Sequence, residues 1–135
     1  MFSVIRFSGS NSVLRELGIQ MNSSKPGVFE EISKRGDHFS IEVSDSVDWA
    51  DHRKAAMELI STLEADIQER DPSLIRICLD VACEPSDYQS HLLKEIHLDS
   101  DLLCYLYRNK ISLSISIYSG LDIKADKTGH VSSTD

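Results

Sequence analysis

Apolar residues alternate with serine through residues 111–118, which read Ile-Ser-Leu-Ser-Ile-Ser-Ile-Tyr. A period of two places the aliphatic side chains on one face of a β-strand and the serines on the other, and no helix separates them in this way. A strand with one dry and one wet face is typical of an antiparallel sheet that helices cover on one side. The pattern therefore predicts a strand with Leu113, Ile115 and Ile117 buried.

A second pattern, with the helical period, predicts a long helix from Trp49 to Arg70, capped by Asp48 or Ser46. Its end is expected at Asp71, because a residue before proline disfavours the helical conformation. The apolar stripe of this helix should pack over the sheet and contains Ala56, Leu59, Ile60, Leu63 and Ile67.

Four further stretches are strand-like, at residues 2–8, 28–32, 39–44 and 74–81. The sequence Lys-Arg-Gly-Asp at 34–37 separates the second from the third, and its glycine can take a positive φ, so these two stretches could pair as a hairpin. In the last stretch the residues expected to point inward are Ile75, Ile77, Leu79 and Val81.

Two short helices complete the pattern. One, around residues 11–17, should end at Gly18, because a glycine followed by Ile19 fits a helix C-terminus, and residues 20–27 should then form a surface loop. The other should span about 100–109 and carries Leu102, Leu103 and Leu106.

Together these elements predict a single α+β domain over residues 1–120, with a mainly antiparallel four- to five-stranded sheet and helices packed on one principal face. Its length suits one domain with a hydrophobic core. Residues 121–135 have no periodicity and are expected to form a flexible C-terminal tail.

The compartment expected from the composition is the cytoplasm. The three cysteines are odd in number, and no apolar signal-peptide core follows the first residues, where Arg6 interrupts the apolar run. No apolar run approaches the roughly 20 residues that span a bilayer. A cytoplasmic protein with reduced thiols is therefore predicted, without residence in a membrane.

Charge is unevenly distributed along the chain. The formal net charge is −8, and residues 37–71 hold ten acidic against three basic side chains. Nucleic acid would be repelled by such a segment. Two interpretations remain: a solvated helix face that serves solubility, or an electrostatic landing surface for a basic partner.

The cysteines and histidines do not form a recognisable metal site or catalytic pair in the sequence. A zinc site from Cys78, Cys83, His91 and His97 can be imagined, but the spacing between its members does not fit a zinc site. A nucleophilic pair of Cys83 with His91 would need an oriented base and an oxyanion cradle that the sequence does not show. Cys104 is expected to be a small buried hydrophobe. We therefore expect unpaired thiols and no metal.

The densest polar cluster is formed by Asp48, Asp51 and His52 at the start of the long helix. Acidic residues in a first turn stabilise the helix dipole, which accounts for both aspartates, and a general-base role for His52 would need a partner in a cleft. Trp49 could anchor the core or an interface. Phosphate loops, nucleophile elbows and basic aromatic patches are absent from the sequence, so no catalytic residue and no cofactor is predicted.

The chain resembles the bacterial domain of unknown function 4279 family over residues 2–118. The marks are Leu-Gly-Ile at 17–19, Asp-Trp-Ala-Asp-His-Arg at 48–53, and the final helix that runs into the Ile/Ser strand. The chain departs from the family at Phe39, where a tryptophan is expected, and in a longer connection at 84–97. The family has no established reaction. The resemblance implies a bacterial origin and, for some small cytosolic proteins of this kind, a role as immunity proteins beside polymorphic toxins.

The expected function is thus that of a cytosolic immunity protein that binds a cognate toxin and occludes its active site, without being an enzyme. An acidic blocker suits a basic, nuclease-type toxin. The alternative is a small-molecule or regulatory binding domain, whose mark would be an apolar pocket between helices and sheet. The residues expected to contact the toxin are Asp45, Asp48, Trp49, Asp51 and Glu58.

Overall fold

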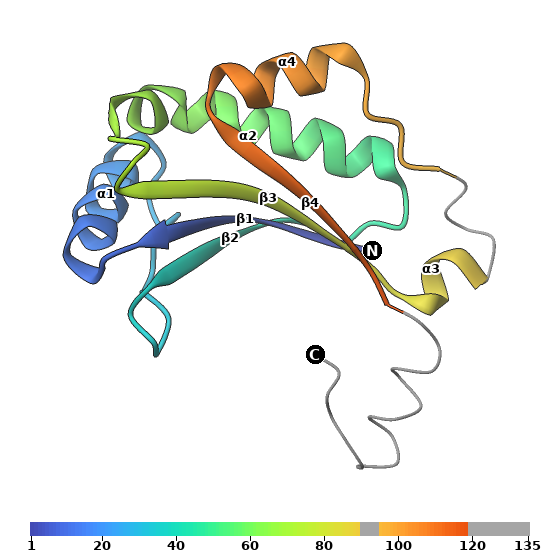
Figure 1. The fold of residues 1–135 in the computed structure, drawn as a ribbon, viewed down its shortest axis with the longest axis horizontal. Coiled ribbons are helices and arrows are strands. Elements are labelled where there is room, and N and C mark those ends of the chain that lie inside the picture. The colour runs from blue at the N-terminus through green and yellow to red at the C-terminus, as the bar shows by residue number, and fades with distance from the viewer. Residues whose placement is uncertain (90–94, 119–135) are drawn as a thin grey trace.

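A four-stranded mixed sheet in the order β2-β1-β3-β4 forms the centre of the computed structural model, which describes residues 1–89 and 95–118 (Figure 1). The central strand β1 pairs antiparallel with both β2 and β3, whereas β4 pairs parallel with β3. The strands are β1 (Phe2–Gly9), β2 (His38–Ser44), β3 (Ile75–Cys83) and β4 (Ile111–Ile117).

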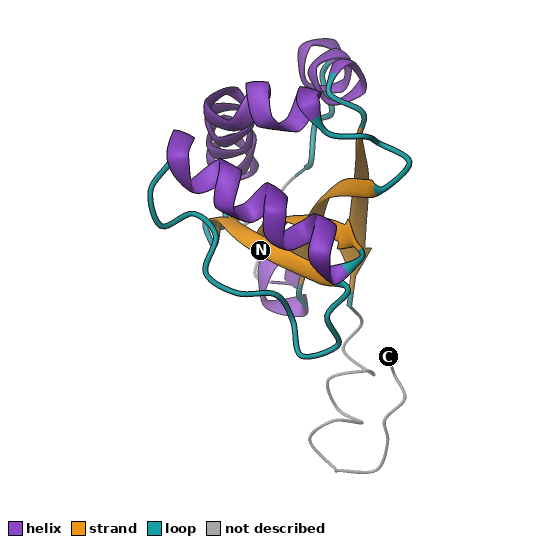
Figure 2. Ribbon diagram, turned by 90° about the vertical axis from the view of Figure 1, so that its left-hand side faces the viewer, coloured by secondary structure: helices purple, strands orange, loops and turns teal. Residues whose placement is uncertain are grey.

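Three helices lie on one face of this sheet, and the opposite face carries no helix of the described part (Figures 1 and 2). They are α1 (Asn11–Ser24), α2 (Trp49–Glu69) and α4 (Ser100–Arg108), and the short α3 (Pro85–Gln89) follows the end of β3. The predicted α+β class, with a mainly antiparallel sheet and helices on one principal face, is confirmed.

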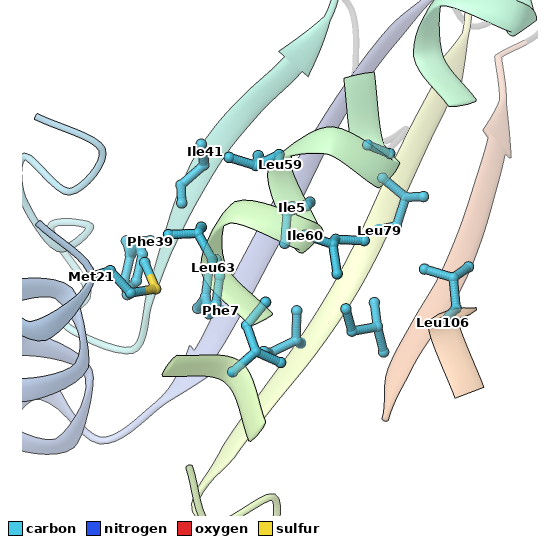
Figure 3. Packing of buried hydrophobic residues seen from close by; sticks show 14 of the residues in the cluster. Ile5, Phe7, Met21, Phe39, Ile41, Leu59, Ile60, Leu63, Leu79 and Leu106 are labelled. Atoms are coloured by element: carbon cyan, nitrogen blue, oxygen red, sulfur yellow. The ribbon is translucent and has the colours of Figure 1, made fainter. Parts of the chain in front are cut away.

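The long helix α2 begins and ends close to the predicted residues. Asp48 caps it and accepts a hydrogen bond from the backbone N–H of Ala50 at 3.0 Å. Leu63 and Ile67 are fully buried against the sheet, and Leu59 is buried beside them (Figure 3). The inward-pointing residues of β3 are buried as predicted. They are Ile75, Ile77, Leu79 and Val81.

The antiparallel pairing that the alternation of the last strand indicated is wrong, because β4 runs parallel to β3, its neighbour in the described sheet. The Ile/Ser alternation reports that one face of the strand is dry and the other wet. That condition holds for any strand of a sheet covered on one side, whichever way the strand runs. The pattern therefore does not determine the direction of β4.

The burial predicted for β4 is also wrong. Only Ile111 is buried, whereas Leu113 is half-buried, Ile115 is 36% exposed and Ile117 is 70% exposed. The helix above it, α4, has nine residues and is about 13 Å long, whereas the seven residues of β4 extend about 23 Å. Because a two-residue turn joins them, α4 covers the beginning of β4 and leaves its end open.

Residues 28–32 do not form the predicted strand, and no hairpin pairs them with β2. The side chain of Asn22 binds both backbone groups of Phe29, accepting from its N–H at 2.9 Å and donating to its carbonyl at 3.1 Å. A side chain thus satisfies groups that a strand partner would otherwise bind. The predicted turn is present, since Gly36 has φ +78° and its N–H bonds to the carbonyl of Ser33 at 2.8 Å.

The first helix does not end at Gly18 but continues through the predicted loop to Ser24. Gly18 is buried in its middle, and a Cβ atom there would lie 2.4 Å from the ring of Phe29. The glycine is therefore required by a close approach rather than by a helix end. The predicted tail at 121–135 lies outside the described residues.

Candidate functional site

His52 is enclosed in a polar pair rather than placed in a cleft. Its Nε2 lies 2.5 Å from the carbonyl of Ser46, which can only accept, so Nε2 carries a proton and donates. Its Nδ1 lies 2.6 Å from Oγ of Ser3. Ser3 is 0% exposed and His52 1% exposed, so substrate cannot reach either group in this structure. The pair ties the loop before α2 to strand β1.

A second buried polar group lies nearby at Asp87, which follows the end of β3. Burial alone would raise the pKa of this carboxyl group, but hydrogen bonds from the α-ammonium of Met1 and from the N–H of Glu84 outweigh burial and hold the pKa below its ordinary value. Asp87 is thus ionised, and its carboxylate accepts hydrogen bonds that hold the N-terminus and residue 84 in place, which is a structural role.

The three cysteines are free thiols in different surroundings. Cys104 is exposed, which contradicts its predicted burial, because it lies on the side of α4 opposite Leu102. Burial, followed by the nearby Asp80, raises the pKa of Cys78 to about 11, so its thiol is a poor nucleophile. Among the described residues no group of three or more His, Cys, Asp or Glu side chains could hold a metal ion. His91 lies outside these residues.

The acidic segment at 37–71 does not form one surface. Several of its carboxylates are engaged within the fold: Asp66 is buried and accepts from Ser24 at 2.7 Å, and Glu64 binds Arg108 and Asn109 of the α4 end at 3.1 and 3.0 Å. The hydrogen bond from Asn109, followed by those from other neighbours, outweighs burial and lowers the pKa of Glu64. These acids are part of the structure and are not available to a partner.

Two exposed acids of the segment, Glu42 and Glu58, lie beside the outer edge of β2. A groove of about 320 Å³ lies between β2 and α2, with Glu42 on the strand side and Glu58 on the helix side. A neighbouring hollow of about 420 Å³ shares Glu42 and Lys25 with it. We call the exposed carboxylates around these hollows and the start of α2 the acidic rim; its members are Glu30, Glu31, Glu42, Asp45, Asp48, Asp51 and Glu58.

The outer edge of β2 lies beside residues 28–32 and is left largely unpaired. In the described part of the chain, the backbone hydrogen bond to the outer edge of β2 is the one from the N–H of Ser33 to the carbonyl of His38, at 2.8 Å. The groove wall also contains the apolar side chains of Ile41 and Leu59. Peptide groups, apolar surface and carboxylates therefore meet in one place.

Four of the five predicted contact residues lie at the surface. Asp45, Asp48, Asp51 and Glu58 are exposed, and Asp51 and Glu58 lie two turns apart on the flank of α2 that faces the groove. Trp49 does not belong to this surface, because its ring is only 7% exposed and its Nε1 donates to the carbonyl of His97 at 2.9 Å. It is a core anchor that holds residue 97 against α2.

The five predicted contact residues did not include Glu30, Glu31 or Glu42, although Glu42 belongs to the acidic segment at 37–71. Glu42 carried a signal, since it points away from the core between the buried Ile41 and the half-buried Val43 of an alternating strand. The two glutamates before Ile32 carried none, because their place follows from the way residues 28–32 pass along β2 without pairing with it.

The described helices include none with the length and apolar character needed to cross a membrane. Comparison of the chain with protein-family models, with curated proteins and with solved structures finds no match. The resemblance to the domain of unknown function 4279 family therefore stays a hypothesis.

Proposed function

We propose that this protein acts by binding a basic protein partner along the acidic rim, without catalysing a reaction. The observation that carries the proposal is the groove beside the open edge of β2, with Glu42 on one wall and Glu58 on the other. Carboxylates on the helix and on the strand beside the groove favour lysine and arginine side chains, and the unpaired backbone groups of β2 suit an extended segment of the partner.

Within this class, the function proposed is that of a bacterial immunity protein that neutralises a nuclease-type toxin. A nuclease must hold phosphate groups, so its active site is basic and complementary to the acidic rim. Binding there would occlude the site from nucleic acid. The class of toxin rests on this complementarity and on the family resemblance.

Two features favour binding over the other functions considered. The Ser3–His52 pair, which has the composition of a nucleophile and a base, is closed to solvent. Half of the residues that line the hollow between α2 and β2 are polar or charged, among them Glu42, Glu58 and Lys25, whereas a small-molecule pocket would be mainly apolar.

The experiment that tests the proposal is co-expression with the protein encoded directly upstream. A stable complex, together with protection of cells from that protein, would support an immunity function. Glu58→Lys should weaken protection, and Glu16→Lys, which makes the same charge change at an exposed position of α1, should not. Absence of both a complex and protection would contradict the proposal.

A further inference from the structure

Exposed apolar side chains concentrate on α4 and on the second half of β4. Nine large apolar side chains of the described residues are exposed, and more than half of them belong to this one helix–strand unit. An apolar cluster of this kind on a charged protein marks an interaction site. The five residues are Leu103, Tyr107, Ile115, Ile117 and Tyr118.

The two helical members of the cluster face the outer side of the sheet. On α4, the flank that carries Tyr105 and Arg108 faces α2, because Arg108 pairs with Glu64 at 3.1 Å and stacks over the Tyr105 ring. Leu103 and Tyr107 are one turn apart on the opposite flank, and so they face away from α2. That direction is the outer side of β4, the edge strand.

Within the described residues, the outer edge of β4 pairs with no strand and lacks the usual protection against pairing. Its seven residues include no charged residue, no proline and no glycine, and its pairing with β3 is regular throughout. Natural edge strands are usually shielded by such residues or by a bulge. The other edge strand, β2, carries Glu42, and its pairing with β1 contains an irregularity at Ser3 and Val4.

We infer that β4 is the interface of a symmetric homodimer, in which β4 pairs antiparallel with β4 of a second copy. The register that pairs the whole strand is centred on Ser114, which then lies opposite its own counterpart. Ile117 lies opposite Ile111 of the partner, and Leu113 opposite Ile115. The two four-stranded sheets become one continuous sheet, and the closed two-fold contact leaves no further β4 edge for chain growth.

The sequence of β4 favours a second copy as the occupant of this edge. In the register centred on Ser114, aliphatic side chains lie opposite aliphatic ones and serines opposite serines, and the lack of charge on β4 limits the repulsion between two chains that each carry −8. Because α4 runs opposite to β4, the two-fold axis also places the two α4 helices antiparallel. Leu103 and Tyr107, on the outer flank of each α4, then face the α4 helix of the other copy.

The dimer is independent of the proposed function, because the acidic rim lies at the opposite edge of the sheet. Its first test is the mass of the full chain in solution by sedimentation. The wild-type protein should be a dimer of 15.2 kDa chains. Ile117→Lys should give a monomer with an unchanged circular dichroism spectrum, because Ile117 is 70% exposed and does not support the fold. Ile19→Lys, at a 62% exposed position of α1, should remain a dimer.

A cross-link tests the register. With Cys104 replaced by serine, Ser114→Cys should form a disulfide-linked dimer on mild oxidation, because opposite residues of antiparallel strands have Cα atoms about 5 Å apart. Ser116→Cys should not form this disulfide. In the proposed register, residue 116 lies opposite residue 112 of the second copy, four residues from that copy's residue 116. A monomeric wild-type protein, a dimer that survives Ile117→Lys, or cross-linking through residue 116 instead of residue 114 would each overturn the inference.

Discussion

Replacement of Gly18 by alanine tests whether this glycine is required by packing. On helix propensity alone, Gly18→Ala should stabilise the protein by about 1 kcal/mol, because alanine is the better residue in a helix interior. The structure predicts the opposite sign. The new Cβ atom would lie 2.4–2.5 Å from three carbons of the Phe29 ring, well inside van der Waals contact.

The size of the effect depends on how far Phe29 can move. Its backbone is held by both hydrogen bonds to Asn22, and its ring is 9% exposed and meets the Phe39 ring edge-on at 4.9 Å between centroids. Phe39 in turn stacks on Phe7 at 4.7 Å, so a shift of Phe29 propagates into the core. Overpacking of this kind costs about 1–3 kcal/mol, and its upper range applies here. After the gain in helix propensity, a net loss of about 1–2 kcal/mol is expected.

Urea denaturation measures this loss, and a double-mutant cycle identifies its cause. Removing the ring by Phe29→Ala will itself destabilise the protein, but in that background Gly18→Ala should become neutral or stabilising because the clash is gone. A rise in stability on Gly18→Ala in the wild-type background would refute the packing role of the glycine. An equal loss in both backgrounds would place the strain elsewhere than at Phe29.

Three further outcomes follow from the core and the surface. Leu63→Ala should cost about 2–5 kcal/mol because its side chain is 1% exposed, whereas Leu103→Ala, at 44% exposure, should cost less than about 1 kcal/mol; similar losses would contradict the assignment of the core. Hydrogen bonds from Arg53 lower the pKa of Asp99 from 3.8 to about 2, so the ion pair stabilises the fold above about pH 4 and this contribution disappears as the pH falls towards 2. Asp99→Asn should flatten the dependence of Tm on pH in that window, and an unchanged slope would count against the pair. Cys104 should be the first thiol to react with a disulfide reagent at pH 8, and Cys104→Ser should remove the fast phase; a fast phase that persists would contradict the burial of the other two thiols.

Much of the fold follows from local patterns in the chain. The burial of Leu63 and the cap at Asp48 could be predicted because helical periodicity and capping are properties of neighbouring residues. The direction of β4 could not, since it depends on how the segment between β3 and β4 crosses the sheet. Nor could the end of α1, because Gly18 is compatible with a helix end and with a close contact, and Phe29 decides between them.

The candidate site was predictable in part, for a similar reason. Exposed acids at the start of an amphipathic helix, such as Asp48 and Asp51, can be recognised from its period. Glu30 joins them only because residues 28–32 pass along the edge of β2, which no local pattern indicates. The sequence is compatible with Trp49 in the core or at an interface. Its burial and its hydrogen bond to the carbonyl of residue 97 place it in the core.

The association rate with the protein encoded directly upstream tests the acidic rim most directly, measured by stopped flow over a series of salt concentrations. For the wild-type protein the rate should fall steeply as salt increases, because charge steers the encounter. Glu58→Lys should slow association by roughly tenfold at low salt and weaken its dependence on salt, whereas Glu16→Lys should change both far less. Equal effects of the two variants, or a rate that does not depend on salt, would contradict binding through the acidic rim.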